Sequence, residues 1–117
     1  MAKILIADDI EGVRRMLTQT LEDEHQIVQA NNGLEAVHLA QVETPEIVIL
    51  DLDMPVLDGV EAARQIKTCV PGSKIIAMTG QPNSENAALV KELCDAFLEK
   101  PFRVTELREA IKTLLGN

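Results

Sequence analysis

Four aspartates follow closely after two apolar runs of the chain. Asp8 and Asp9 follow the first run, and Asp51 and Asp53 follow the third. If these runs are parallel strands of one sheet, their carboxyl ends meet at one edge and bring the carboxylates into one crevice. Carboxylates held close together raise one another's pKa, and a divalent cation relieves that repulsion. Because a small set of oxygen ligands suits Mg²⁺ better than zinc, the pattern favours a magnesium site.

A hydroxyl and an ammonium follow two further runs. Thr79 comes after the fourth run and Lys100 after the fifth. Phosphoryl transfer depends mostly on positioning and on neutralising charge, and a cation, a lysine and a hydroxyl around a carboxylate provide both. The set therefore favours transfer of a phosphoryl group to an aspartate. The first run is not followed by a Gly-rich loop, which argues against the phosphate loops of nucleotide- and flavin-binding proteins.

The apolar runs that carry these residues have the character of short strands. Each is too short for an independent helix, is rich in Ile, Val or Leu, and ends in polar or turn residues. The first, third and fourth are almost continuously apolar, as strands covered by helices on both faces are. The runs are Lys3–Ala7, Gln26–Ala30, Glu46–Leu50, Lys74–Met78 and Ala96–Glu99.

Between the runs, apolar residues recur every three or four positions, which predicts helices. Asn32 and Asp58 each stand three residues before a glutamate, as the first residue of a capping box does. For the last helix, Arg103 is a poor cap and Thr105 is the expected one. The alternation predicts an α/β fold: a doubly wound, five-stranded parallel sheet with right-handed crossovers and helices on both faces.

Composition limits the function classes. The length of 117 residues is that of one domain, and we expect residues 1–117 to form a single domain. Acidic residues outnumber basic ones by 19 to 11, and the net charge of −8 argues against binding nucleic acid or an anionic membrane. The apolar runs are too short to span a membrane, and the acidic start is no signal peptide, so we expect a cytoplasmic protein. Cys69 and Cys94 have no histidine in metal-ligand spacing and are interpreted as buried thiols of a reducing compartment.

Four segments in a fixed order carry a more specific signal. They are Asp8-Asp9, the stretch from Ile47 to Gly59 with its Asp51-Leu52-Asp53-Met54-Pro55 core, Ala77-Met78-Thr79-Gly80, and Phe97-Leu98-Glu99-Lys100-Pro101-Phe102. This combination resembles the receiver domains of two-component response regulators, and the resemblance covers essentially the whole chain. It implies a flavodoxin-like receiver fold with strand order 2-1-3-4-5.

The resemblance also implies a phosphorylation site. Asp51 is the expected phosphate acceptor. Asp9 and Asp51 are the expected side-chain ligands of Mg²⁺, with Asp8 acting through water and the backbone carbonyl of Asp53 completing the site. Lys100 is the expected ion-pair partner of the acceptor and then of the phosphoryl oxygens.

A switch is implied by the same resemblance. Thr79 is the expected switch hydroxyl, and Phe97 matches the aromatic residue that turns inward when the threonine moves. Pro101 is expected to follow a cis peptide bond. The donor would be a phosphohistidine on a sensor histidine kinase or a histidine phosphotransfer protein. A downstream protein target or output domain would read the changed surface of the fourth helix, last strand and last helix, roughly Ser84–Leu115. The chain would catalyse only its own phosphorylation and dephosphorylation.

Two positions depart from the usual pattern of the family. Asp53 adds a carboxylate beside the site, where it either holds a water molecule or slows phosphorylation by repulsion. Gly80 stands where alanine is commoner, and its smaller bulk predicts easier access of water to the phosphoryl group and fast dephosphorylation.

Two other functions compete with this interpretation. The Asp51-Leu52-Asp53 segment also resembles the nucleophile motif of haloacid-dehalogenase-type phosphatases, but that motif lies on an early strand and needs more chain after it. The second is a receiver-like interaction module that is never phosphorylated, against which the complete set of phosphorylation residues argues.

Overall fold

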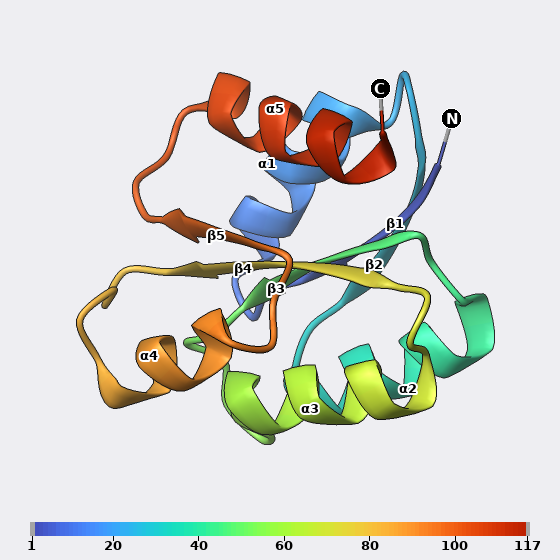
Figure 1. The fold of residues 1–117 in the computed structure, drawn as a ribbon. Coiled ribbons are helices and arrows are strands. Elements are labelled where there is room, and N and C mark those ends of the chain that lie inside the picture. Colours follow the sequence, from blue (N-terminus) through green and yellow to red (C-terminus); the bar gives the residue numbers. More distant parts are fainter. Residues whose placement is uncertain (1, 117) are drawn as a thin grey trace.

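A five-stranded sheet lies between two layers of helices in the computed structural model, which describes residues 2–116 (Figure 1). All neighbouring strands are parallel, and their order is β2-β1-β3-β4-β5. The strands are β1 (Lys3–Ala7), β2 (Gln26–Ala30), β3 (Ile47–Asp51), β4 (Lys74–Thr79) and β5 (Ala96–Glu99). The helices are α1 (Glu11–Leu21), α2 (Gly33–Glu43), α3 (Gly59–Cys69), α4 (Glu85–Lys91) and α5 (Val104–Leu115). The predicted fold class and strand order are confirmed.

Each face of the sheet has its own apolar core. Helices α1 and α5 cover one face, and α2, α3 and α4 cover the other (Figure 1). Successive side chains of a strand point to opposite faces, so Ile4 and Ile6 of β1 join the first core while Leu5 joins the second. The central strands must be apolar at all positions between their ends for this reason, which explains their continuous runs.

The strand ends differ slightly from the prediction at the two places that matter for the site. Strands β1, β2 and β5 have the predicted bounds, whereas β3 lies one residue later and β4 is one residue longer. The Leu52 amide donates to the Met78 carbonyl at 2.9 Å, so pairing between β3 and β4 continues past Leu50. Asp51 and Thr79 are therefore the last residues of their strands, and the sheet itself holds their backbones in place.

The helix starts confirm two predicted caps and correct a third. The side chains of Asn32 and Asp58 accept from the backbone amides three residues on, at 2.8 and 2.9 Å. Thr105 is not the cap of the last helix, because α5 begins at Val104. Instead the Glu106 carboxylate accepts from the Arg103 amide at 3.1 Å and satisfies a donor at the helix start.

The cysteine prediction is correct only in part. Both thiols are free, but Cys69 is exposed and Cys94 is half-buried. Cys69 is the last residue of α3, and its side chain lies on the solvent side of that helix end. Within residues 2–116, none of the helices has the length and apolar character needed to cross a membrane.

Candidate functional site

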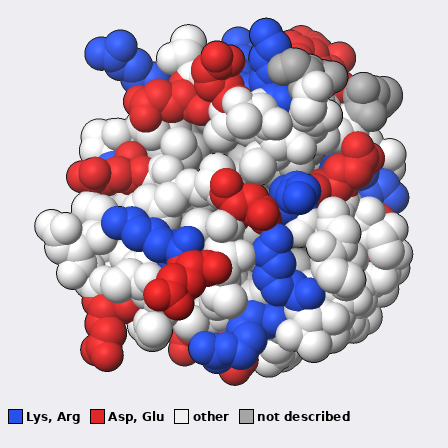
Figure 2. Space-filling model, viewed as in Figure 1, with Lys and Arg blue, Asp and Glu red and all other residues white. Residues whose placement is uncertain are grey.

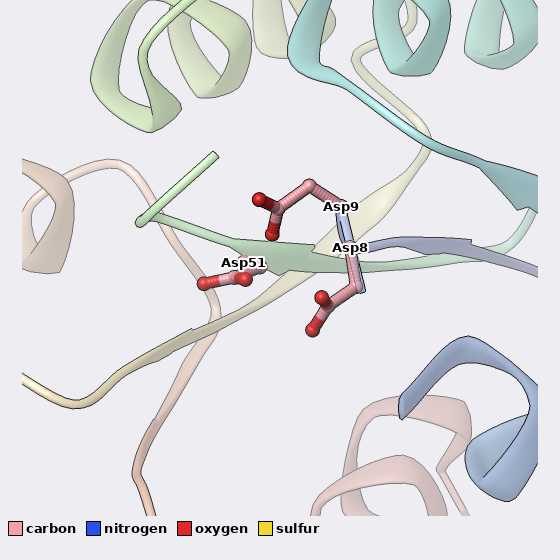
Figure 3. A group of neighbouring side chains, drawn as sticks. All are labelled: Asp8, Asp9 and Asp51. Carbon is pink, nitrogen blue, oxygen red and sulfur yellow. The ribbon is translucent and has the colours of Figure 1, made fainter. Parts of the chain in front are cut away.

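Three carboxylates gather at the carboxyl ends of β1 and β3. One oxygen each of Asp8, Asp9 and Asp51 lies within 4.8 Å of the others (Figure 3). The two strands are neighbours with Ala7 opposite Leu50, so the residues that follow them must lie side by side. Asp8 and Asp51 are almost fully buried, while Asp9 is exposed. The crevice therefore has a buried floor and an open mouth.

Lys100 brings a positive charge into the crevice from the end of β5. Its Nζ lies 3.0 Å from Oδ1 of Asp51 and 4.0 Å from Oδ2 of Asp8. The Lys100 amide donates to the Thr79 carbonyl at 2.8 Å, which continues the pairing of β4 with β5 and aligns the lysine with the neighbouring strand end. The Lys100–Pro101 peptide is cis, as the family resemblance implies.

The carboxylates of the two buried aspartates, Asp8 and Asp51, differ in their hydrogen-bond partners. Oδ1 of Asp51 accepts from the Asp53 amide at 3.0 Å in addition to its contact with Lys100. Oδ1 of Asp8 accepts from the Ile10 amide at 2.9 Å, but its buried Oδ2 has no hydrogen-bond partner within the described chain. Burial raises the pKa of Asp8 to about 6, with the nearby charge of Asp51 adding to the shift.

The unpartnered oxygen of Asp8 tests whether a cation fits this site. A buried carboxylate oxygen without a donor is costly, and it faces two other carboxylates rather than a second cationic side chain. Hard oxygen ligands in this number match Mg²⁺, which keeps part of its water shell when a protein binds it. The residues present therefore fit a magnesium ion.

Thr79 lies at the carboxyl end of β4, at the same edge of the sheet, but its hydroxyl is hydrogen-bonded to Asp53. Its hydroxyl lies 3.1 Å from Oδ1 and 3.3 Å from Oδ2 of Asp53, to which it donates. The Gly80 amide donates to Oδ2 of Asp53 at 3.1 Å, and the Thr79 hydroxyl accepts from the Gln81 amide at 2.9 Å. Neither alternative foreseen for Asp53, a held water or simple repulsion, included these direct contacts.

Phe97 lies outside the crevice. It is half-buried on β5, where it packs against the core shared by α2, α3 and α4. The Nζ of Lys91 on α4 lies 4.8 Å from the centre of its ring. The aromatic ring thus connects β5 to α4, and its register partner on β4 is Ala77, two residues before Thr79.

Two sets of contacts near the site gave no signal in the sequence. The Arg14 guanidinium donates to the Asp8 carbonyl at 2.7 Å and holds the loop between β1 and α1. Asp53 could be noticed as an extra carboxylate, but its partners depend on how the loop after β3 folds back toward β4. No spacing rule predicts the contact of Arg14, which lies one turn into α1, or the contacts of Asp53, which depend on a loop conformation.

Outside the crevice, charges are mixed. Figure 2 shows lysine and arginine interspersed with aspartate and glutamate over the face it displays. With a net charge of −8, this distribution gives the chain no excess of positive charge for phosphate backbones.

The chain matches known proteins over nearly its full length. The family model of the response regulator receiver domain matches residues 4–112. The chemotaxis protein CheY of Halobacterium salinarum is 39% identical over 119 residues, which covers 98% of this chain and 98% of that protein. The sporulation initiation phosphotransferase F of Bacillus subtilis is 36% identical over 115 residues, covering 97% and 93%.

A solved structure agrees with these relatives. The CheY-like receiver domain protein of Methanospirillum hungatei superimposes with a TM-score of 0.93 at 27% identity, covering 98% of this chain and 94% of that one. Receiver domains accept phosphoryl groups in two-component and phosphorelay signalling, and they bind Mg²⁺ at an acidic pocket. The sheet order, the acidic crevice and the full-length matches agree with one another. The chain belongs to the response regulator receiver family.

Proposed function

We propose that Asp51 accepts a phosphoryl group from a phosphohistidine. The observation that carries this proposal is the pairing of a buried Asp51 carboxylate with Lys100 at 3.0 Å, beside two further carboxylates. Lys100 and the Asp53 amide both bind Oδ1 of Asp51, and within residues 2–116 no hydrogen bond reaches Oδ2. Oδ2 is thus the oxygen that forms the new bond to phosphorus, while the bond from phosphorus to the donor nitrogen breaks and the imidazole leaves.

The carboxylates of Asp8, Asp9 and Asp51 would hold Mg²⁺ in this function, Asp8 through water, together with the backbone carbonyl of Asp53. When bound, the ion supplies positive charge that offsets the carboxylates and the phosphoryl oxygens. Lys100 begins as the ion-pair partner of Asp51 and ends as a partner of the phosphoryl group, so it stays neutralised throughout. The domain turns over no other substrate in this proposal.

The switch follows from the donors at the end of β4. The Thr79 hydroxyl would bind a phosphoryl oxygen, and Phe97 would move inward with it. Phe97 packs between β5 and α4, so a change in its position alters the surface formed by α4, β5 and α5. We propose that a downstream protein target or an output domain recognises this surface.

The proposed donor is a sensor histidine kinase or a histidine phosphotransfer protein. Two-component partners are the general expectation for the family, and the Bacillus subtilis relative is a sporulation initiation phosphotransferase. We further propose that the domain, taken as residues 1–117, works in the cytoplasm, where its free thiols remain reduced.

Phosphorylation can be tested by mass spectrometry of the intact protein. The chain is incubated with Mg²⁺ and a small phosphodonor, and we expect a gain of one phosphoryl group that disappears when Mg²⁺ is chelated. Asp51→Asn should gain none, whereas Asp53→Asn, which removes the other carboxylate of the motif, should still gain one. A wild-type protein that gains nothing would favour the interaction module, and turnover of p-nitrophenyl phosphate would favour a phosphatase.

A further inference from the structure

We propose that Asp53 is an internal latch that occupies the phosphoryl-binding donors of the switch before phosphorylation. The proposal rests on the proposed function of Asp51, and it assigns a role to a carboxylate whose purpose the sequence left open. Two donors converge on the Asp53 carboxylate: the Thr79 hydroxyl at 3.1 Å and the Gly80 amide at 3.1 Å. An O–H and an N–H aimed at one point form an anion site, and here an anion of the chain already fills it.

The loop after β3 makes this contact possible. Asp51 is the last residue of β3, and the Asp53 amide turns back to donate to the Asp51 carboxylate at 3.0 Å. The Asp53 backbone is therefore tied to the acceptor, while its side chain crosses to the end of the neighbouring strand β4. One residue connects the place where the phosphoryl group forms with the hydroxyl that must respond to it.

Competition follows from charge and from the number of donors. The Thr79 hydroxyl has a single proton, so it cannot donate to Asp53 and to a phosphoryl oxygen together. A phosphoryl group on Asp51 would also lie next to the Asp53 carboxylate, and like charges repel. Phosphorylation must therefore displace Asp53 from Thr79 and Gly80, and that displacement lowers the stability of the phosphorylated state. The latch holds Thr79 until a full phosphoryl charge replaces the carboxylate.

Thr79 is already ordered by its own surroundings, which makes the latch a competitor rather than a support for the fold. The side chain is almost fully buried, and its hydroxyl oxygen also accepts from the Gln81 amide at 2.9 Å. Removing the Asp53 carboxylate leaves this second bond in place. We therefore expect Asp53 variants to fold and to change the affinity of the site for anions.

The latch can be measured with beryllofluoride, a non-covalent phosphoryl analogue, at saturating Mg²⁺. Its dissociation constant is determined by calorimetry for wild type, Asp53→Ala and Asp53→Asn, after the Mg²⁺ affinity of each has been measured separately. We expect Asp53→Ala to bind beryllofluoride about tenfold more tightly than wild type, the size of effect expected when a charged hydrogen-bonding competitor is removed. Asp53→Asn keeps an acceptor oxygen but not the charge, so its affinity should fall between the two. Glu99→Gln removes an exposed charge on β5 next to the site and should change the affinity by less than about twofold.

A double-mutant cycle separates the latch from general repulsion. In a Thr79→Val background the hydroxyl is absent, so the gain from Asp53→Ala should be smaller than in the wild-type background. An equal gain in both backgrounds would show repulsion alone and overturn the latch. Equal or weaker beryllofluoride binding by Asp53→Ala would overturn it as well.

The amide resonance of Gly80 gives a readout that does not require phosphorylation. In the absence of any anion, Asp53→Ala should move the Gly80 amide proton upfield and speed its exchange with solvent, because the charged acceptor is gone. An unchanged Gly80 resonance would refute the latch whatever the anion affinities are. If no variant binds beryllofluoride, the proposed function fails, and this resonance alone decides whether Asp53 holds the end of β4.

Discussion

Two aspartates at opposite edges of the sheet show how differently the fold treats a carboxylate. Asp8 follows β1 at the carboxyl edge, and Asp95 precedes β5 at the amino edge. Asp95 accepts from Lys67 at 2.5 Å and from the Ile75 amide at 2.8 Å, both through Oδ2. Within residues 2–116 the Asp8 carboxylate accepts one hydrogen bond, from the Ile10 amide, and its lysine neighbour is 4.0 Å away.

The pKa shifts of these two groups have opposite signs. For Asp95, partial burial acts to raise the pKa, but the hydrogen bonds from Lys67 and Ile75 outweigh it and lower the pKa below the usual 3.8. For Asp8, burial dominates and raises the pKa to about 6. The amino edge satisfies its carboxylate within the fold, whereas the carboxyl edge leaves one to be satisfied by a ligand. Three changes to the chain or its conditions test this contrast, and a fourth tests the access of water to the carboxyl edge.

The largest expected effect is a gain in stability from Asp8→Asn without divalent cations. Asparagine keeps the acceptor for the Ile10 amide and replaces the unpartnered Oδ2 with a donor facing Asp51. A carboxyl whose pKa rises from 3.8 to about 6 on folding destabilises the fold at pH 7 by about 3 kcal/mol, so the variant should gain that much. Urea denaturation measures the gain, and Asp23→Asn, at an exposed turn, should show none. A destabilised Asp8→Asn would contradict the contrast.

The same site predicts a dependence on pH. Because the folded-state pKa of Asp8 lies above its unfolded value, the folded state holds this proton more tightly than the unfolded one. Relative to Asp8→Asn, wild type should therefore become more stable as pH falls through about 6, with the gap largely closed below 3.8. Denaturation curves of the two proteins across this range give the difference directly. A gap that stays constant would mean that Asp8 is not responsible for it.

At the amino edge, Lys67→Met should lower the stability of the fold, whereas Asp8→Asn should raise it. It removes the ammonium that pairs with Asp95 and donates to the Ser73 carbonyl, and both pair members are about a quarter exposed. Allowing for that exposure, we expect a loss of about 1 kcal/mol in the free energy of unfolding at pH 7. Since the pKa of Asp95 is lowered in the fold, the stabilisation is present above 3.8 and is lost as pH falls below it. Arg64→Met breaks a more exposed pair on the same helix and is the control, with a change below about 0.5 kcal/mol.

The smallest expected effect concerns Gly80. A Cβ at this exposed position would meet no atom within 4 Å, so Gly80→Ala should fold normally. The added methyl group would hinder water at the phosphoryl group and lengthen the half-life of phosphorylated Asp51 about twofold, a small change in barrier. Decay of the phosphorylated mass after removal of the donor measures it. Gly72→Ala, equally unhindered but located before the amino end of β4, should leave the half-life unchanged, and a shorter half-life in Gly80→Ala would refute the prediction.

Much of the fold and of the candidate site could be predicted from the amino-acid sequence. The apolar runs predict the strands, with β1, β2 and β5 at their observed bounds. The signal is strongest in β1, β3 and β4, because a strand covered on both faces needs apolar side chains at nearly every position. The grouping of Asp8, Asp9 and Asp51 follows from parallel strands, whose carboxyl ends must share one edge. Local rules also predicted the caps at Asn32 and Asp58, since each bond joins residues three positions apart.

Only the tertiary structure decided how the side chains of the crevice are bonded. The contact of Asp53 with Thr79 joins residues 26 positions apart through a loop whose path has no sequence signal. The exposure of Cys69 likewise depended on which side of α3 packs against the rest of the fold. The cap of α5 depended on which acceptor lies within hydrogen-bond distance of the Arg103 amide. Periodicity specifies which face of an element is apolar, but hydrogen bonds and pKa values depend on distances of a few ångströms between distant residues. Those distances are set only when both cores have packed and the strand ends are held in place.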